Sequence, residues 1–162
     1  MNKEMNIKFK FDNNSKNSIY FIQNYIESSE LLNEISTKNR IPWHTHTIIE
    51  NPESIILFNE LIDKISKDFN IIPSKTRINH FEKNTIKQYH KDFYKQDLTI
   101  VLNLHPGRVL FKNDKTECIT DFYIEPNTLY IFDKSVNEHW LHRVEVGDTD
   151  RISIVVWGVR KN

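Results

Sequence analysis

Residues 151–159 read RISIVVWGV, a run dominated by apolar and β-branched side chains that predicts a β-strand. Similar short runs, separated by turn residues, fill the chain after Pro73. They are TRINHF (76–81), LTIVLNL (98–104), RVLF (108–111), DFYIE (121–125) and TLYIFD (128–133). Short strands at this spacing indicate an antiparallel sandwich or barrel.

Two segments upstream of these strands carry helical patterns. Residues 19–35 are typical of a short strand followed by a helix, and residues 53–69 place apolar side chains close to one helical stripe. Between them, residues 40–52 contain Pro42 and Trp43, which favour a loop or an edge strand. The sequence therefore predicts an α+β fold that is mainly β, with two helices covering the outside.

The length of the chain, 162 residues, suits a single domain spanning residues 1–162, because two separate cores need more chain. Residues 1–18 are polar and broken by charge, so we interpret them as an N-terminal extension without a secretory signal. No apolar run is long enough to cross a membrane. We expect an intracellular monomer, cytoplasmic or nuclear.

Charge and cysteine content narrow the chemistry. Lys+Arg and Asp+Glu number 22 each, so the chain lacks the overall positive charge of many nucleic-acid-binding proteins. The single cysteine, Cys118, excludes an internal disulfide and a cysteine-based zinc site. Any metal site must therefore use histidines and carboxylates.

His90 and Asp92 form an H-x-D pair. If the pair lies in a strand, both side chains point to one face and can reach one ion. His142, just before the last predicted strand, is the candidate third ligand. Two imidazoles and one carboxylate on one side of an ion form the facial triad of non-haem Fe(II) oxygenases, which leaves positions open for a cosubstrate and O₂.

His139 competes with His142 for the third position, since it lies close by in the same segment. We favour His142 because Trp140 and Val144 share its face in an extended strand and would wall the site. His139 is then expected to be a solvated loop residue.

Arg151 and Ser153 form a second pair two residues apart, so both side chains face inward in a barrel. A lone inward Arg is a costly unpaired charge, whereas a bound dicarboxylate would meet it in a bidentate, charge-assisted pair. The alternative is that Arg151 lies at a frayed strand end and pairs with Asp148 or Asp150.

These residues resemble the AlkB-like family of Fe(II)/2-oxoglutarate dioxygenases, and the likeness runs from about residue 19 to residue 160. The family's N-x-Y strand, followed by H-x-D, is matched by Asn79 to Phe81 and by His90 eleven residues after Asn79. The family's W-x-H-x-V segment is similar to residues 140–144, and its terminal R-x-[NS] segment is similar to residues 151–157.

The resemblance implies a double-stranded β-helix, or jelly roll, with two N-terminal helices packed on one sheet. It implies Fe(II) at His90, Asp92 and His142, with no catalytic residue beyond these ligands, and 2-oxoglutarate at Arg151, Ser153 and Asn79. In such enzymes O₂ drives decarboxylation of 2-oxoglutarate to succinate and hydroxylation of a substrate C–H bond. On an N-methyl group the reaction releases formaldehyde, which demethylates a base.

Three positions depart from the family's pattern. Phe81 replaces a tyrosine and removes a hydroxyl contact to the cosubstrate, and Trp157 stands where the family has a second arginine near the iron. Tyr94 stands where base-repairing members place an acidic residue. The resemblance is therefore weakest for base repair.

The family carries its substrate lid between the helices, where this chain has only residues 38–52. Trp43 and His44, with His46, could stack on a base or line a substrate pocket that also includes Tyr94. The alternative is that Trp43 anchors the core and both histidines are solvated.

The predicted function is AlkB-type oxidative demethylation or hydroxylation, with a methylated nucleobase or nucleic acid as substrate and O₂ as the oxidant. Two alternatives stay open. The first is hydroxylation of a protein side chain or a small molecule, which a short lid and an open site would suit. The second is a non-enzymatic jelly-roll module whose metal serves structure only.

Overall fold

The computed structural model describes residues 6–10 and 18–162. Its strands are β1 (Asn6–Lys10), β2 (Ser18–Ile22), β3 (Arg40–Trp43), β4 (His46–Ile49), β5 (Ile71–Phe81), β6 (Leu98–Asn103), β7 (Gly107–Asn113), β8 (Ile119–Ile124), β9 (Thr128–Asp133), β10 (Trp140–Glu145) and β11 (Arg151–Arg160). Its helices are α1 (Ser29–Ser36), α2 (Ile56–Asp68) and α3 (Lys134–His139), and η1 (Pro52–Ser54) is a 3₁₀ turn.

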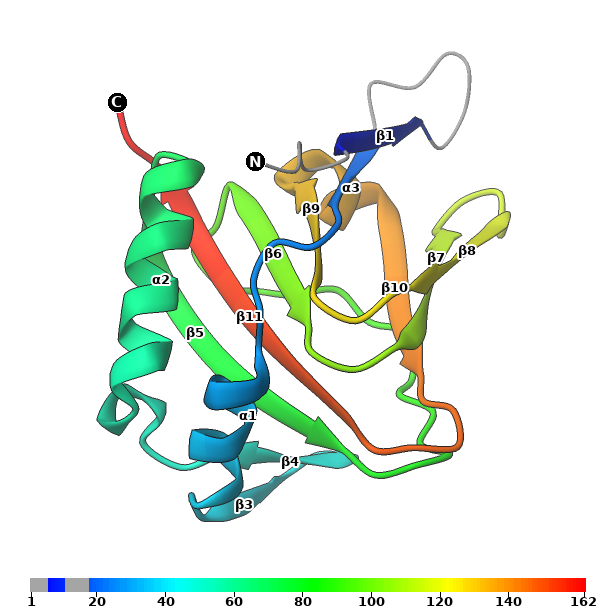
Figure 1. Ribbon diagram of the computed structural model, residues 1–162. Helices are drawn as coiled ribbons and strands as arrows, with labels where there is room; N and C mark the ends of the chain where they lie inside the picture. The colour runs from blue at the N-terminus through cyan, green and yellow to red at the C-terminus, as the bar shows by residue number, and fades with distance from the viewer. Residues whose placement is uncertain (1–5, 11–17) are drawn as a thin grey trace.

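The described strands form two antiparallel sheets that face each other as a jelly roll (Figure 1). The larger sheet has eight strands in the order β1-β2-β9-β6-β11-β5-β4-β3, and the smaller has three in the order β10-β7-β8. Figure 1 shows α1 and α2 on one side of the larger sheet and the smaller sheet on the other. The prediction of a mainly β fold with few helices is confirmed.

The run at residues 151–159 forms β11, which lies between β5 and β6 and is buried from Arg151 to Gly158. Because side chains alternate across a strand, β11 serves both faces of the larger sheet. Ile152, Ile154 and Val156 pack in the cluster that includes α1 and α2. Val155 and Trp157 pack toward the smaller sheet.

The outer core lies between the two longer helices and the larger sheet. Leu31 and Ile35 of α1 join Phe58, Leu61 and Ile65 of α2 in one buried cluster. Because these residues recur at helical spacing, they lie on one side of each helix. Each helix therefore buries its apolar side against the sheet and exposes its charged side chains to solvent. This layer fixes the back of the larger sheet and leaves its front face for the site.

The inner core, between the sheets, combines aromatic and polar side chains. Phe111, Phe132 and Trp140 fill one end of it. Polar side chains from β5, β6 and β11 fill the other end, and Asn79, Asn103 and Ser153 are all at most 7% exposed. A buried polar layer inside a small barrel marks the region where chemistry is possible.

Three segments test the sequence-based expectations, and two of them differ from those expectations. Residues 1–18, interpreted as an extension, contain β1, which pairs with β2 at the edge of the larger sheet, while residues 1–5 and 11–17 lie outside the described residues. Residues 38–52 contain the β3–β4 hairpin at the other edge, so the edge-strand interpretation fits there. Helix α3 was not predicted. No helix within the described residues is both long enough and apolar enough to span a membrane.

Candidate functional site

His90, Asp92 and His142 come together on the inner side of the jelly roll. One ligand atom from each lies within 4.8 Å of the other two, a group that could hold a metal ion. Asp92 Oδ1 lies 3.5 Å from His90 Nε2, and Asp92 Oδ2 lies 3.5 Å from His142 Nε2. The donor set is two nitrogens and one carboxylate, which suits non-haem Fe(II) and leaves coordination positions free.

Both imidazoles are arranged to offer a lone pair. The carbonyl of Gln88 can only accept a hydrogen bond, so His90 Nδ1–H donates to it at 2.9 Å and leaves Nε2 unprotonated. Burial lowers the pKa of His90, and burial lowers the pKa of His142 to about 3. Both rings are therefore neutral near pH 7, as metal ligation requires.

The carboxylate of Asp92 is buried but stays ionised. Burial acts to raise its pKa, but His142, a hydrogen bond from Trp157 and the nearby Lys87 outweigh burial and lower the pKa. Trp157 Nε1–H donates to Asp92 Oδ2 at 3.0 Å. Trp157, where the resemblance implied the loss of a positive charge, thus orients a candidate ligand.

The H-x-D pair does not lie in a regular strand, which corrects the sequence-based assumption. Residues 82–97, which we call the ligand arm, join β5 to β6 and contact β10 through two isolated bridges, Ile86 with Glu145 and His90 with His142. The backbone N–H of each of these two histidines donates to the carbonyl of the other, at 2.9 and 3.0 Å. A single bridge is enough to set two candidate ligands side by side.

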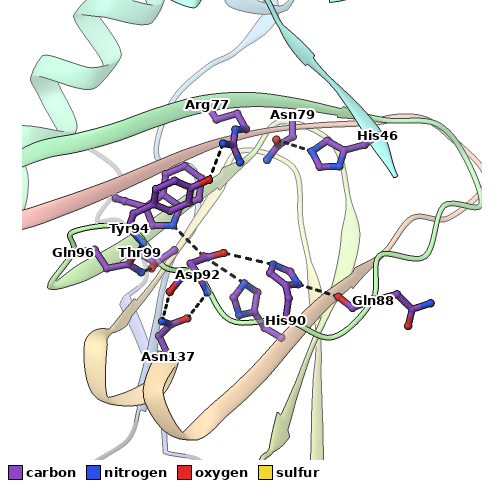
Figure 2. Close-up of polar contacts among 12 residues, drawn as sticks. His46, Arg77, Asn79, Gln88, His90, Asp92, Tyr94, Gln96, Thr99 and Asn137 are labelled. Carbon is purple, nitrogen blue, oxygen red and sulfur yellow. Dashed lines mark hydrogen bonds and ion pairs between the residues drawn. The ribbon is translucent and has the colours of Figure 1, made fainter. Parts of the chain in front are cut away.

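Asn137 of α3 holds the arm beyond the last bridge. Its Oδ1 accepts from the backbone N–H of Asp92 at 3.0 Å, and its Nδ2 donates to the Asp92 carbonyl at 2.8 Å. Figure 2 shows this amide directly beside Asp92. Sequence reasoning missed Asn137. The sequence held one signal for the helix that carries Asn137. Asp133 is a favourable N-cap residue, and its side chain accepts a hydrogen bond from the Val136 N–H at the start of α3.

His139, the rival for the third ligand position, ends α3 and is exposed. It is not a member of the group that could hold a metal. His142 lies on β10 with Trp140 and Val144, and all three are buried on one face. The structure therefore brings His142, and not His139, to the other two residues.

Arg151 lies in the same cavity as the three candidate ligands and is fully buried. Its Nη2 donates to Asn103 Oδ1 at 2.5 Å, while Nε and Nη1 have no hydrogen-bond partner among the described residues. The alternative pairing with Asp150 does not occur, since Asp150 binds His80 and the backbone N–H of Lys83. Two orphaned donors on a buried cation fit an anionic ligand such as a carboxylate.

The surroundings of Arg151 also favour a carboxylate. Burial raises the pKa of Tyr130, which lines the same cavity, so its hydroxyl keeps its proton as a potential donor. Gly107 lies against the guanidinium: a Cβ atom there would be 2.9 Å from Arg151 Cδ and 3.1 Å from Nη1. Glycine at this position gives Arg151 its space.

Asn79 and Ser153 lie opposite each other on β5 and β11, and both line this cavity. Asn79 Oδ1 is 3.0 Å from His46 Nε2, and His46 stacks on Phe81 with ring centroids 4.3 Å apart. His46 is therefore buried, which corrects the alternative that it is solvated. Burial lowers its pKa to about 4, so it acts as a neutral hydrogen-bond donor to Asn79.

The inner cavity has an open volume of about 50 Å³. Lys87 lines both this cavity and the hollow outside it.

The outer hollow, of about 510 Å³, holds all three predicted substrate residues, Trp43, His44 and Tyr94. His90 and Asp92 line it too, so it opens directly onto the candidate metal site. It contains further side chains that sequence reasoning did not select, chiefly Arg77, Lys91 and Phe93. The predicted residues are thus gathered at one mouth.

Arg77 lies among aromatic rings at this mouth. Its guanidinium carbon is 4.4 Å from the centroid of Trp43, 5.2 Å from that of Trp157 and 5.6 Å from that of Tyr94. Its Nη2 donates to the Tyr94 hydroxyl at 2.8 Å, as Figure 2 shows. The faces of these rings are therefore in contact with a cation.

Comparison with solved structures finds prolyl hydroxylases. The chain is similar to a prolyl-4-hydroxylase of Pseudomonas putida, with a TM-score of 0.61 and 12% identity over 91% of this chain and 95% of that one. It is also similar to a prolyl hydroxylase from Trichoplax adhaerens in complex with a peptide fragment of the hypoxia inducible factor oxygen degradation domain. That TM-score is 0.63, with 14% identity over 86% of this chain and 82% of that one.

At these identities the likeness concerns the fold. No protein-family model matches the chain, and no curated protein matches it. The structural neighbours support the jelly roll expected from the sequence, while AlkB-type specificity finds no support in them.

Proposed function

We propose that this protein is an Fe(II)- and 2-oxoglutarate-dependent oxygenase that hydroxylates a C–H bond of a polypeptide side chain. One observation carries the proposal. A triad of His90, Asp92 and His142 shares a buried cavity with Arg151, a cation whose Nε and Nη1 have no partner among the described residues. A metal site beside a buried cation with unpartnered donors is the arrangement that a chelating keto diacid requires.

The triad residues fit an iron ion. His90 and His142 offer neutral imidazoles and Asp92 offers an anion, so the protein supplies one negative charge and half of an octahedral shell. Fe(II) with 2-oxoglutarate and O₂ supplies oxidative decarboxylation coupled to hydroxylation. Around it, Asn137 and Trp157 hold Asp92 in place through hydrogen bonds.

The inner wall fits the far carboxylate of 2-oxoglutarate. Arg151 Nε and Nη1 would donate to it, and Ser153 and the Tyr130 hydroxyl lie in the same cavity. In this water-poor cavity a bidentate guanidinium pair both binds and orients the cosubstrate. The keto acid end would then face the triad, which lines the same cavity.

A polypeptide substrate is better supported than the methylated nucleobase expected from the sequence. Trp43, which was proposed for base stacking, and Tyr94, which was proposed for the substrate pocket, both have Arg77 against a ring face. A base would have to displace that cation before stacking. One structural neighbour was solved with a peptide, which agrees with a substrate of this class.

The first test of the proposal is spectroscopic and needs no substrate. Anaerobic addition of Fe(II) and 2-oxoglutarate to the protein is expected to give a weak visible charge-transfer band, and admission of air should release succinate. Purified His142→Ala should lose both signals, and His139→Ala should keep them. A wild-type protein that binds Fe(II) yet develops neither band nor succinate would contradict the oxygenase assignment and favour a structural metal module.

A further inference from the structure

We infer that the substrate is an extended polypeptide segment that adds to the uncovered edge of β5 and binds Arg77 through an acidic side chain. This inference rests on the proposed function and names the substrate class of the same site. Three observations carry it: the charge of Arg77, the hollows that meet there, and the backbone of β5.

Arg77 is a buried cation without an anionic partner. It is 8% exposed, and within the described part of the chain it takes part in no ion pair. The faces of Trp43 and Trp157 lie against its guanidinium, and Nη2 donates to the Tyr94 hydroxyl, so the neighbours that surround this charge are neutral. A carboxylate arriving edge-on would make a charge-assisted pair in a largely desolvated place.

Arg77 also stands where three hollows meet. It lines the inner cavity with the metal triad, the outer hollow of about 510 Å³, and a groove of about 650 Å³. Trp43 lines both of the larger hollows. The groove runs between residues 48–53 and residues 73–77. A chain lying in it therefore passes Arg77 on its way to the metal site.

One wall of this groove is the edge of β5, and most of that edge has no neighbouring strand among the described residues. On one side β5 pairs with β11 along its length, but on the other side β4 pairs only with Asn79 and His80. The Thr47 hydroxyl donates to the His80 carbonyl, so the backbone groups of His80 point toward β4. By alternation those of Thr76 point the same way, into the groove and beyond the end of β4.

A bare strand edge beside a cation selects an extended peptide. Main-chain hydrogen bonds to a strand edge give affinity without regard to sequence, and a pocket or charge beside the edge gives specificity. Lys75 adds positive charge beside Arg77 in the groove, and Lys87 and Lys91 add more in the outer hollow next to the metal site, whereas Glu50 and Glu53 lie on the opposite wall of the groove. The acidic residue is therefore expected near the reacting residue.

The test compares matched peptides by succinate release. Randomised peptide pools fixed with Asp or Glu at one position are compared with pools fixed with Asn or Gln, which have the same shape without the charge. Wild-type protein should prefer the acidic pools by about 10–100-fold in kcat/KM. Arg77→Gln should reduce this preference to near one, while Arg160→Gln, which removes an exposed charge at the end of β11, should preserve it.

Each outcome bears on the inference separately from the proposed function. Loss of the charge-transfer band in wild-type protein would remove the oxygenase itself. A normal band with no turnover of any acidic pool above the rate without peptide would overturn the inference alone. So would turnover of methylated oligonucleotides in place of peptides, or an Arg77→Gln variant that raises the 2-oxoglutarate KM and keeps the acid-to-amide ratio.

A second measurement tests the strand addition on unaltered protein. In the best peptide, backbone N-methylation at single positions should lower kcat/KM at the residue opposite Thr76 by about tenfold and leave its two neighbours nearly unaffected. A uniform response along the peptide would show that the backbone is not bound as a strand. Because the change is made in the peptide, the folding of a variant cannot obscure the result.

Discussion

The two walls of the candidate site are built in different ways. The cosubstrate wall, Asn79, Arg151 and Ser153, belongs to β5 and β11, whose ladder runs from Ile71–Arg160 to Phe81–Arg151. The ligand arm that carries His90 and Asp92 has two isolated bridges to β10 and a side-chain amide for support. One wall is fixed by a continuous strand ladder, and the other by separate backbone hydrogen bonds to β10 and by the side chain of Asn137.

This difference separates stability from chemistry. A residue of the cosubstrate wall can hardly change without disturbing a central strand, because each side chain there also faces a packed interior. The ligand arm lies outside the ladders, so its residues can change with little effect on the fold. Substitutions in the cosubstrate wall should therefore lower both activity and Tm, whereas substitutions in the ligand arm should lower activity and leave Tm nearly unchanged.

The largest effect is expected in the arm. Asp92→Ala should lower succinate formation by more than about 100-fold. Loss of a residue that only orients a metal ligand already lowers metal affinity or activity by about 10–100-fold, and Asp92 is itself a candidate ligand. The Tm of the metal-free variant should stay within a few degrees of wild type, as Asp92 belongs to no strand. Succinate detection and calorimetry check the two parts. A large drop in Tm would show that the arm supports the fold after all.

In the other wall, Arg151→Lys should raise the KM for 2-oxoglutarate by about 10–100-fold, because a lysine lacks the planar fork that binds both carboxylate oxygens. Wild-type Tm should rise with added Fe(II) and 2-oxoglutarate, and the rise should shrink in the variant. Steady-state kinetics and thermal shift measure these changes. An unchanged KM would mean that Arg151 does not anchor the cosubstrate.

Asn137 tests how the arm is held. Asn137→Ala removes both hydrogen bonds to the Asp92 backbone and should weaken Fe(II) affinity by about tenfold, with activity restored at higher metal concentration. Metal titration followed by succinate release provides the measurement. Activity that stays low at saturating Fe(II) would assign Asn137 a role other than positioning.

A smaller effect is expected at Gly107. Gly107→Ala places a Cβ atom against Arg151 and should raise the 2-oxoglutarate KM by roughly 3–10-fold, through displacement of the guanidinium. Gly147→Ala is the matched control, because a Cβ atom there would meet nothing within 4 Å. Equal kinetics for the two variants would argue against a steric role for Gly107.

The smallest effect concerns pH. The pKa of His46 is about 4 in the folded protein and ordinarily 6.5, so between these values the unfolded chain binds more protons. Stability contributed by neutral His46 is complete above about pH 6.5 and is lost as the pH falls toward 4. His46→Gln should therefore lose less Tm than wild type between pH 7 and pH 5. Parallel Tm curves would mean that His46 is not held neutral.

Many strands of the two sheets could be predicted from the sequence, whereas the conformation of the ligand arm, residues 82–97, could not. Apolar alternation located β6, β9 and β11, because these strands are buried and their side chains alternate between two interiors. The i, i+2 spacing also brought Arg151 and Ser153 to one face. For the H-x-D pair the same rule selected two residues that do lie beside His142, but the strand that it assumed is absent there, since an isolated bridge and Asn137 set their geometry.

The residues that were missed depend on contacts between distant parts of the chain. Asn137 meets Asp92 across 45 positions, and Arg151 meets Asn103 across 48. Arg77 gained importance only when Trp43 and Trp157 were seen around it. Helix α3, KSVNEH, has too few residues to show a helical period, so its Asp133 cap was the one local signal.

The two hydrogen bonds between the Asn137 amide and the Asp92 backbone bear on how the proposed iron would enter the site. These two bonds, the bond from Trp157 to Asp92 and the contacts of Lys91 are all local, and local opening takes far less free energy than unfolding the chain. Iron could then load into finished molecules, and a chelator could strip it without denaturing them.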